Sequence, residues 1–218
     1  MAKHFQRELE KIKRMILSLG TIVESRVRDA REAIESLDAD ISERIVKSDY
    51  EIDEMEVEVE EECLKIIALH QPVAVDLRFL VAVIKINNDL ERIGDQAVNV
   101  AQRIQTIAKK EKMDFVFDYT EMAEKVEVML KMSLDALVNF DIDIAFKVMT
   151  LDDEVDAIKH EAYRRIREVI RDHSSHVEYL INMLLISRHL ERMADHATNI
   201  AEEVVYMIEG EIVRHGNY

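Results

Sequence analysis

The sequence predicts an all-α protein made of two pseudo-symmetric three-helix bundles, with six long helices and an internal duplication. Three observations support this fold class. Glycine (4) and proline (1) are scarce among 218 residues, so few positions interrupt a helix. Apolar residues recur at helical spacing over long stretches. The segment LERIGDQAVNVA (90–101) returns 100 residues later as LERMADHATNIA (190–201).

Each predicted helix has its own apolar stripe and ends where the stripe is interrupted. The turn LDAD (37–40) separates the first two helices, and Pro72 suits the first turn of the third. A polar and aromatic linker, KKEKMDFVFD (109–118), separates the two halves. The predicted helices run from about Phe5 to Leu37, from Ile41 to Leu69 and from Val73 to Ala108, and then start near Thr120, Ile142 and His176.

The second half of the chain repeats the first. AIESLDADI (33–41) matches ALVNFDIDI (136–144) at an offset of 103, and EID (51–53) matches EVD (154–156) at the same offset. The repeat unit is therefore a set of three helices about 100 residues long. We expect the first three-helix repeat to occupy residues 1–110 and the second to occupy residues 117–218.

Charge and composition narrow the functional class. The formal net charge of −16 argues against a nucleic-acid partner and favours cations. The one cysteine, Cys63, excludes an internal disulfide and is expected in the core. The N-terminal segment lacks the apolar block of a signal peptide, and the longest apolar run, FLVAVI (79–84), is too short to cross a bilayer. We expect a cytoplasmic protein without membrane insertion.

Acidic residues four positions apart interrupt the apolar stripes of four helices. This spacing places both side chains of a pair on one helix face, one turn apart. The third helix carries such a pair after Ile84, and the sixth carries one after Leu184. The pairs are Asp49 and Asp53, Glu91 and Asp95, Asp152 and Asp156, and Glu191 and Asp195.

The predicted hairpins bring these pairs together two by two. Residues that face each other across an antiparallel hairpin are equidistant from its turn. Asp49 and Asp95 are equidistant from Pro72, as are Asp53 and Glu91. In the second half, Asp152 and Asp195 are equidistant from the HSSH turn (173–176), as are Asp156 and Glu191. The sequence therefore predicts two quartets of carboxylates, each between two neighbouring helices.

Four clustered carboxylates need positive charge nearby, or their pKa values rise. Carboxylate oxygens suit Mg²⁺, Ca²⁺, Mn²⁺ and iron, and four bridging carboxylates have room for more than one ion. The alternative is a set of salt bridges to Arg78, Arg92 or Arg192. His189 and His196 flank the second quartet and are candidates for its metal shell or for the surface. Gly94 and Ala194 occupy matching places and are expected to allow close helix approach.

These motifs resemble the PhoU family of phosphate uptake regulators. That family has paired E(D)-x-x-x-D motifs on a duplicated three-helix bundle, and this chain reads DYEID (49–53), ERIGD (91–95), DDEVD (152–156) and ERMAD (191–195). IALHQPVAVDLRFL (67–80) also resembles the family's segment between its second and third helices. The second repeat departs from this, because HSSHVEYL (173–180) replaces the HQP turn.

The resemblance implies a regulatory adaptor rather than an enzyme. It implies multinuclear metal clusters on the eight motif acids, with iron expected first and Mn, Mg, Zn or Ca as alternatives. It also implies negative regulation of phosphate-starvation signalling through the ATPase of a phosphate ABC transporter and a phosphate sensor kinase, and a homodimer. Two other interpretations use the same acids. One is a carboxylate-bridged metalloenzyme, and the other is a metal-free helical scaffold.

Overall fold

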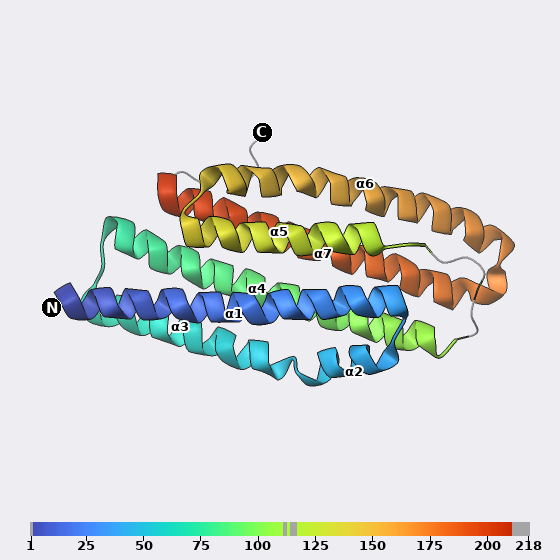
Figure 1. The fold of residues 1–218 in the computed structure, drawn as a ribbon, viewed down its shortest axis with the longest axis horizontal. Helices are drawn as coiled ribbons and strands as arrows, with labels where there is room; N and C mark the ends of the chain where they lie inside the picture. The colour runs from blue at the N-terminus through green and yellow to red at the C-terminus, as the bar shows by residue number, and fades with distance from the viewer. Residues whose placement is uncertain (1, 111–112, 114–116, 211–218) are drawn as a thin grey trace.

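The computed structural model describes residues 2–110, 113 and 117–210 of the chain, and these form an elongated, all-helical molecule (Figure 1). The predicted all-α fold with six long helices and an internal duplication is confirmed. The helices of the first half are α1 (Ala2–Ser36), α2 (Ala39–Lys47), α3 (Tyr50–His70) and α4 (Ala74–Ala108). Those of the second half are α5 (Thr120–Asn139), α6 (Ile142–Asp172), the short 3₁₀ helix η1 (Ser174–His176) and α7 (Val177–Glu209).

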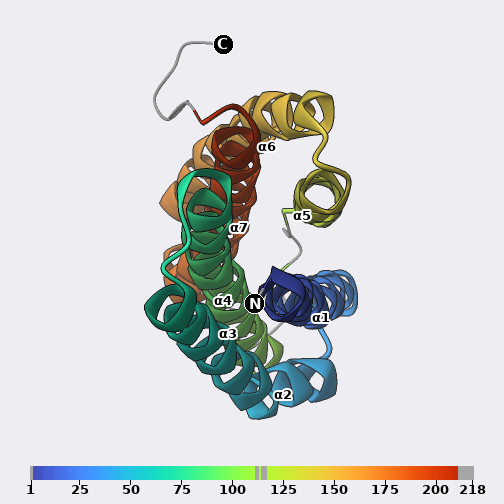
Figure 2. The ribbon, with the colours of Figure 1, turned by 90° about the vertical axis from the view of Figure 1, so that its left-hand side faces the viewer.

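The long helices lie in two groups. In the end-on view, α3, α4, α7 and α6 form one curved row, and α1 and α5 lie on its inner side (Figure 2). The interface between α4 and α7 is the most extensive in the molecule, and α1 also contacts α5. The two halves therefore pack against each other through their equivalent helices.

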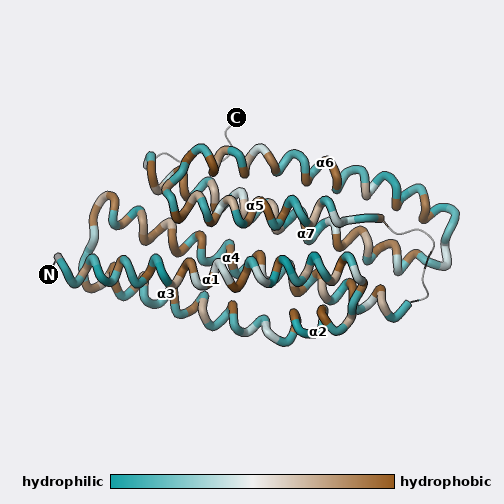
Figure 3. Tube along the Cα trace, viewed as in Figure 1, coloured by the Kyte–Doolittle hydropathy of each residue, from teal (hydrophilic) through white to brown (hydrophobic). Residues whose placement is uncertain are grey.

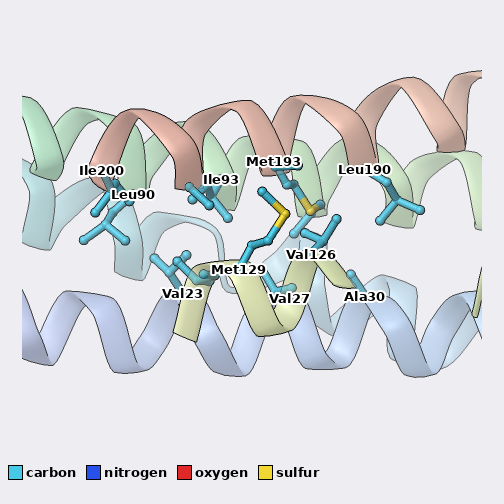
Figure 4. Packing of buried hydrophobic residues seen from close by; sticks show 14 of the residues in the cluster. Val23, Val27, Ala30, Leu90, Ile93, Val126, Met129, Leu190, Met193 and Ile200 are labelled. Atoms are coloured by element: carbon cyan, nitrogen blue, oxygen red, sulfur yellow. The ribbon is translucent and has the colours of Figure 1, made fainter. Parts of the chain in front are cut away.

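The hydrophobic core fills the space between these two groups. Val23 and Val27 of α1 point toward Leu90 and Ile93 of α4, and Met193 of α7 packs from the second half (Figure 4). All five side chains are almost completely buried. The apolar stripes alternate with polar faces along every long helix (Figure 3), as expected for amphipathic helices that share one core.

Glycine allows two of these helices to approach closely. A Cβ atom on Gly94 of α4 would lie 2.8 Å from Cδ1 of Ile52 on α3, which is nearer than side chains tolerate. Gly94 therefore permits the approach of α3 and α4 that the sequence predicted. Cys63 is buried in the core on α3, also as predicted.

The predicted second helix is divided into α2 and α3 at Ser48 and Asp49. The guanidinium of Arg26, nearly buried on α1, donates to the Ser48 hydroxyl and to the Ser48 carbonyl oxygen at 3.2 Å. At the repeat offset of 103, the residue equivalent to Arg26 is Met129, and α6 continues without a break. The buried arginine stabilises carbonyl and hydroxyl groups at the break, and the second half lacks this partner.

Candidate functional site: two acidic quartets

The first quartet lies on α3 and α4, with Asp49 immediately before α3. Burial, followed by the charges of Asp53 and Asp95, raises the pKa of Asp49. Burial and the neighbouring Asp95 raise the pKa of Glu91, and Asp53 across the hairpin adds to this. Asp49 and Glu91 therefore each interact with the carboxylate that the hairpin register places opposite: Asp95 for Asp49, and Asp53 for Glu91.

The second quartet lies on α6 and α7 in the equivalent arrangement. Burial and the charges of Asp195 and Asp156 raise the pKa of Asp152 to about 6. Burial, Glu191 and Asp156 raise the pKa of Asp195. The carboxylates of each quartet therefore lie close enough to interact electrostatically across the hairpin, in the register that the sequence predicted. Asp152 lies in the interior of the continuous helix α6, whereas Asp49 lies at the N-terminal end of α3, where the helix dipole favours a carboxylate.

A basic side chain contacts each quartet, and the two contacts differ in position and in solvent exposure. At the first quartet, Arg92 Nη1 lies 2.9 Å from Asp95 Oδ2, and Arg92 Nε lies 3.3 Å from Glu91 Oε2. These three residues all belong to α4, and the Arg92 side chain is 48% exposed. Arg92 is thus one of the salt-bridge partners expected from the sequence, and it binds from the solvent side.

The second quartet instead contains a lysine that the sequence reasoning missed. Lys159 Nζ lies 2.6 Å from Glu191 Oε1 on α7 and 3.2 Å from Asp156 Oδ1 on α6. Its side chain is only 23% exposed. Partial burial disfavours the charged ammonium, but hydrogen bonds to Glu191 and Asp156 raise the pKa of Lys159. The spacing of Lys159 three residues after Asp156 was a usable signal.

Both quartets offer ligands suited to hard cations, because every member is a carboxylate. One oxygen of Glu91, Oε2, is buried and accepts no hydrogen bond from the described residues. Its contact is instead the ion pair with Arg92 Nε at 3.3 Å, so a positive charge already offsets part of the cost of burying it. With the side chains paired to Arg92 and Lys159, no three Asp, Glu, His or Cys side chains of the described residues converge on one point. Metal binding therefore requires these side chains to turn away from their present partners.

The two candidate histidines lie in the seam between α4 and α7 rather than in the second quartet. His196 Nδ1 is 2.8 Å from Asp89 Oδ1, and Asn199 Nδ2 donates to the same oxygen at 3.2 Å. His189 Nδ1 is 2.9 Å from Gln96 Oε1. At the repeat offset of 100, these two pairs are equivalent to each other, so the seam follows the internal symmetry.

The seam also contains an ion pair that the sequence reasoning did not single out. Lys85 Nζ on α4 lies 3.1 Å and 3.2 Å from the two carboxylate oxygens of Glu203 on α7. Glu203 is almost completely buried. Since Lys85 and Glu203 lie on opposite halves, this pair connects the two repeats. The sequence alone does not show this pair, because the pair depends on the register in which α4 packs against α7.

Comparison with known proteins identifies the family. The model of the PhoU domain matches residues 16–104 and again residues 119–204. This chain belongs to the PhoU family. A PhoU homolog from Clostridium acetobutylicum, named a phosphate-specific transport system accessory protein, is 36% identical over 212 residues, which cover 97% of both chains.

Two solved PhoU structures have the same fold. The crystal structure of PhoU from Pseudomonas aeruginosa superposes with a TM-score of 0.90 at 34% identity, covering 95% of this chain and 100% of that one. The structure of the phosphate transport system regulatory protein PhoU from Streptococcus pneumoniae gives a TM-score of 0.88 at 28% identity, covering 96% and 99%. The Clostridium relative is named an accessory protein and the Streptococcus protein a regulatory protein, and neither is named as an enzyme. Within the described ranges, no helix is long and apolar enough to span a bilayer.

Proposed function

We propose that this protein is a metal-binding regulator of phosphate uptake that acts as an adaptor in phosphate-starvation signalling, and not as an enzyme. The observation that carries this proposal is the match of the PhoU domain to both repeats, together with relatives named as accessory to phosphate-specific transport. The fold supports an adaptor because it presents long helical faces. Its expected partners are the ATPase of a phosphate ABC transporter and a phosphate sensor kinase, and its expected location is the cytoplasm.

The metal component of the proposal assigns all eight acids of the two quartets as ligands. Iron is expected first, with Mn, Mg, Zn or Ca as alternatives, because carboxylates accept all of these ions. Burial, followed by the charges of Asp195 and Asp156, raises the pKa of Asp152 to about 6. This supports the assignment, because a partly buried cluster of carboxylates is stabilised by a cation. A bound metal would remove that repulsion and cross-link α3 to α4 and α6 to α7.

A metal-free scaffold remains the second candidate, because Arg92 and Lys159 already neutralise part of each quartet. The two candidates differ in their response to chelators. A ligand that binds only the folded state raises its melting temperature. The metal proposal predicts a melting temperature that falls in EDTA and is restored by Fe²⁺ or Mn²⁺, whereas the scaffold predicts no change with either treatment.

The docking surface that we propose lies at one end of the molecule. At and beside the turn between α3 and α4, the exposed apolar residues are Leu69 (66%), Val73 (74%) and Val75 (61%); at and beside the turn between α5 and α6 they are Val138 and Phe140. Both turns lie at the same end of the bundle (Figure 1). Gathered exposed apolar side chains are typical of protein interaction sites. This end of the bundle is therefore our candidate for the docking surface of the adaptor.

The regulatory proposal is tested in a bacterium whose own PhoU relative has been deleted. The wild-type chain should restore repression of phosphate-starvation genes in high phosphate. A Val73→Asp/Phe140→Asp variant should fail to restore it and should no longer retain the transporter ATPase in a pull-down. Ile181→Asp, which changes an apolar residue that is 46% exposed at the start of α7, is the matched control and should behave as wild type. Failure of the wild-type chain to restore repression would contradict the proposed function.

A further inference from the structure

The internal repeat allows each residue near one quartet to be compared with its equivalent near the other. At the offset of 103 that aligns Asp53 with Asp156, the residue equivalent to Lys159 is Glu56. The second quartet therefore has an ammonium at the position where the first has a fifth carboxylate. The arginine next to each α4 or α7 pair is the same in both repeats, Arg92 and Arg192. The repeats differ on α3 and α6, by Glu56 and Lys159, and on α1 and α5, by Arg26 and Met129.

Glu56 belongs electrostatically to the first quartet. It contributes to the raised pKa of Glu91, and Asp53 in turn contributes to the raised pKa of Glu56, after burial and Glu60. The first site thus contains five interacting carboxylates. Among the described residues, the exposed Arg92 contacts their oxygens and pairs within its own helix. Exposed pairs of this kind contribute little and are easily broken. The buried Arg26 also lowers the pKa of Asp49 through its charge, but its own contacts are with Ser48 and Glu51.

Lys159 occupies the second quartet differently. Its ammonium bridges α6 and α7, contacts one carboxylate from each helix, and is largely shielded from solvent. Those contacts use oxygens of Asp156 and Glu191, which a metal ion would need as ligands. A divalent cation must therefore displace Lys159 and also tolerate its charge nearby, whereas at the first quartet it gains an additional carboxylate.

We propose that the Lys159 ammonium occupies the place of a metal ion in the second quartet and prevents metal binding there at low metal concentration. The first quartet, extended by Glu56, therefore binds metal before the second. This inference rests on the proposed metal binding. It makes the two sites of the repeat unequal in affinity, so that the second site responds to metal only when the first is already occupied. The chemical class of the ligand is a hard divalent cation.

The test isolates each quartet and titrates the metal-stripped protein with Mn²⁺ by calorimetry. Glu191→Ala/Asp195→Ala leaves only the first quartet, and Glu91→Ala/Asp95→Ala leaves only the second. We expect the first to bind at least tenfold more tightly than the second. Adding Lys159→Met to the second-quartet variant should tighten its binding at least tenfold, and adding Glu56→Lys to the first-quartet variant should weaken it at least tenfold.

A matched lysine provides the control. Lys125 pairs with Glu154 of α6 at 2.6 Å rather than with a quartet acid. Lys125→Met should therefore leave the Mn²⁺ affinity of the second quartet unchanged. Circular dichroism establishes that every variant folds. Equal affinities of the two quartets, or no effect of Lys159→Met, would overturn the role of Lys159 while leaving metal binding intact. Absence of binding to either quartet would instead refute the metal proposal and this inference with it.

Discussion

Replacing Asp152 with asparagine should stabilise the metal-free protein at neutral pH. The folded state raises the pKa of this carboxyl from 3.8 to about 6, so the folded protein binds its proton more tightly than the unfolded chain does. Folding stability must then fall as the pH rises from about 4 to about 6, and the loss persists above pH 6. An asparagine of nearly the same shape carries no charge and avoids this loss.

The magnitude follows from the shift. About two pKa units correspond to about 3 kcal/mol for a fully buried group. Because Asp152 is only partly buried, solvent screening reduces the expected gain to about 1–2 kcal/mol. This is a large fraction of the stability of a typical domain.

The assay is urea denaturation of wild type and Asp152→Asn in EDTA, between pH 4 and pH 7.5. The variant should equal wild type near pH 4 and exceed it by about 1–2 kcal/mol above pH 6. Glu58→Gln, an exposed change on α3, should show no such pH-dependent gain. If Asp152→Asn were less stable than wild type at pH 7.5, the argument that the quartet is electrostatically strained would be wrong.

Three further predictions concern packing and the seam. Gly94→Ala should destabilise the protein by about 1–2 kcal/mol in thermal unfolding, because its Cβ would meet Ile52 Cδ1, and the cost should shrink in an Ile52→Val background. Lys85→Ala should cost about 2–4 kcal/mol in urea denaturation, because it removes the ammonium that pairs with buried Glu203; a loss below 0.5 kcal/mol would refute that role. Burial and Arg103 lower the pKa of His189 to about 4, so the folded state disfavours its protonation. Stability should therefore fall as the pH drops from about 6.5 toward 4, and His189→Gln should remove that part of the pH dependence.

Much of the fold follows from local rules that the sequence displays. Helical periodicity and the repeat offsets predicted the long helices. Distance from Pro72 predicted which acids face each other, because residues equidistant from the turn lie opposite one another in an antiparallel hairpin. The break at Ser48 was not predictable in this way. It depends on Arg26, which is distant in sequence and acts through a tertiary contact.

The candidate site was likewise predictable only in part from the sequence. The eight acids were visible as a repeated spacing, and Arg92 as a neighbour in sequence. The aligned repeats also show Lys159 at the position equivalent to Glu56. The effect of this difference on the site depends on the contact of the Lys159 ammonium with Glu191 on another helix. His189 and His196 do not join the second quartet, because their side chains contact Gln96 and Asp89 on α4. The packing of α7 on α4 determines this, and the sequence does not show that packing.

The most direct test of the account is elemental analysis of the untagged protein. Wild type is compared with Glu91→Ala/Asp95→Ala and with Glu191→Ala/Asp195→Ala, each incubated with iron, manganese, zinc and magnesium and then freed of loosely bound ions. The account predicts stoichiometric metal in wild type and a partial loss in each variant. Metal absent from all three proteins would contradict it and leave the quartets as structural acids held by Arg92 and Lys159.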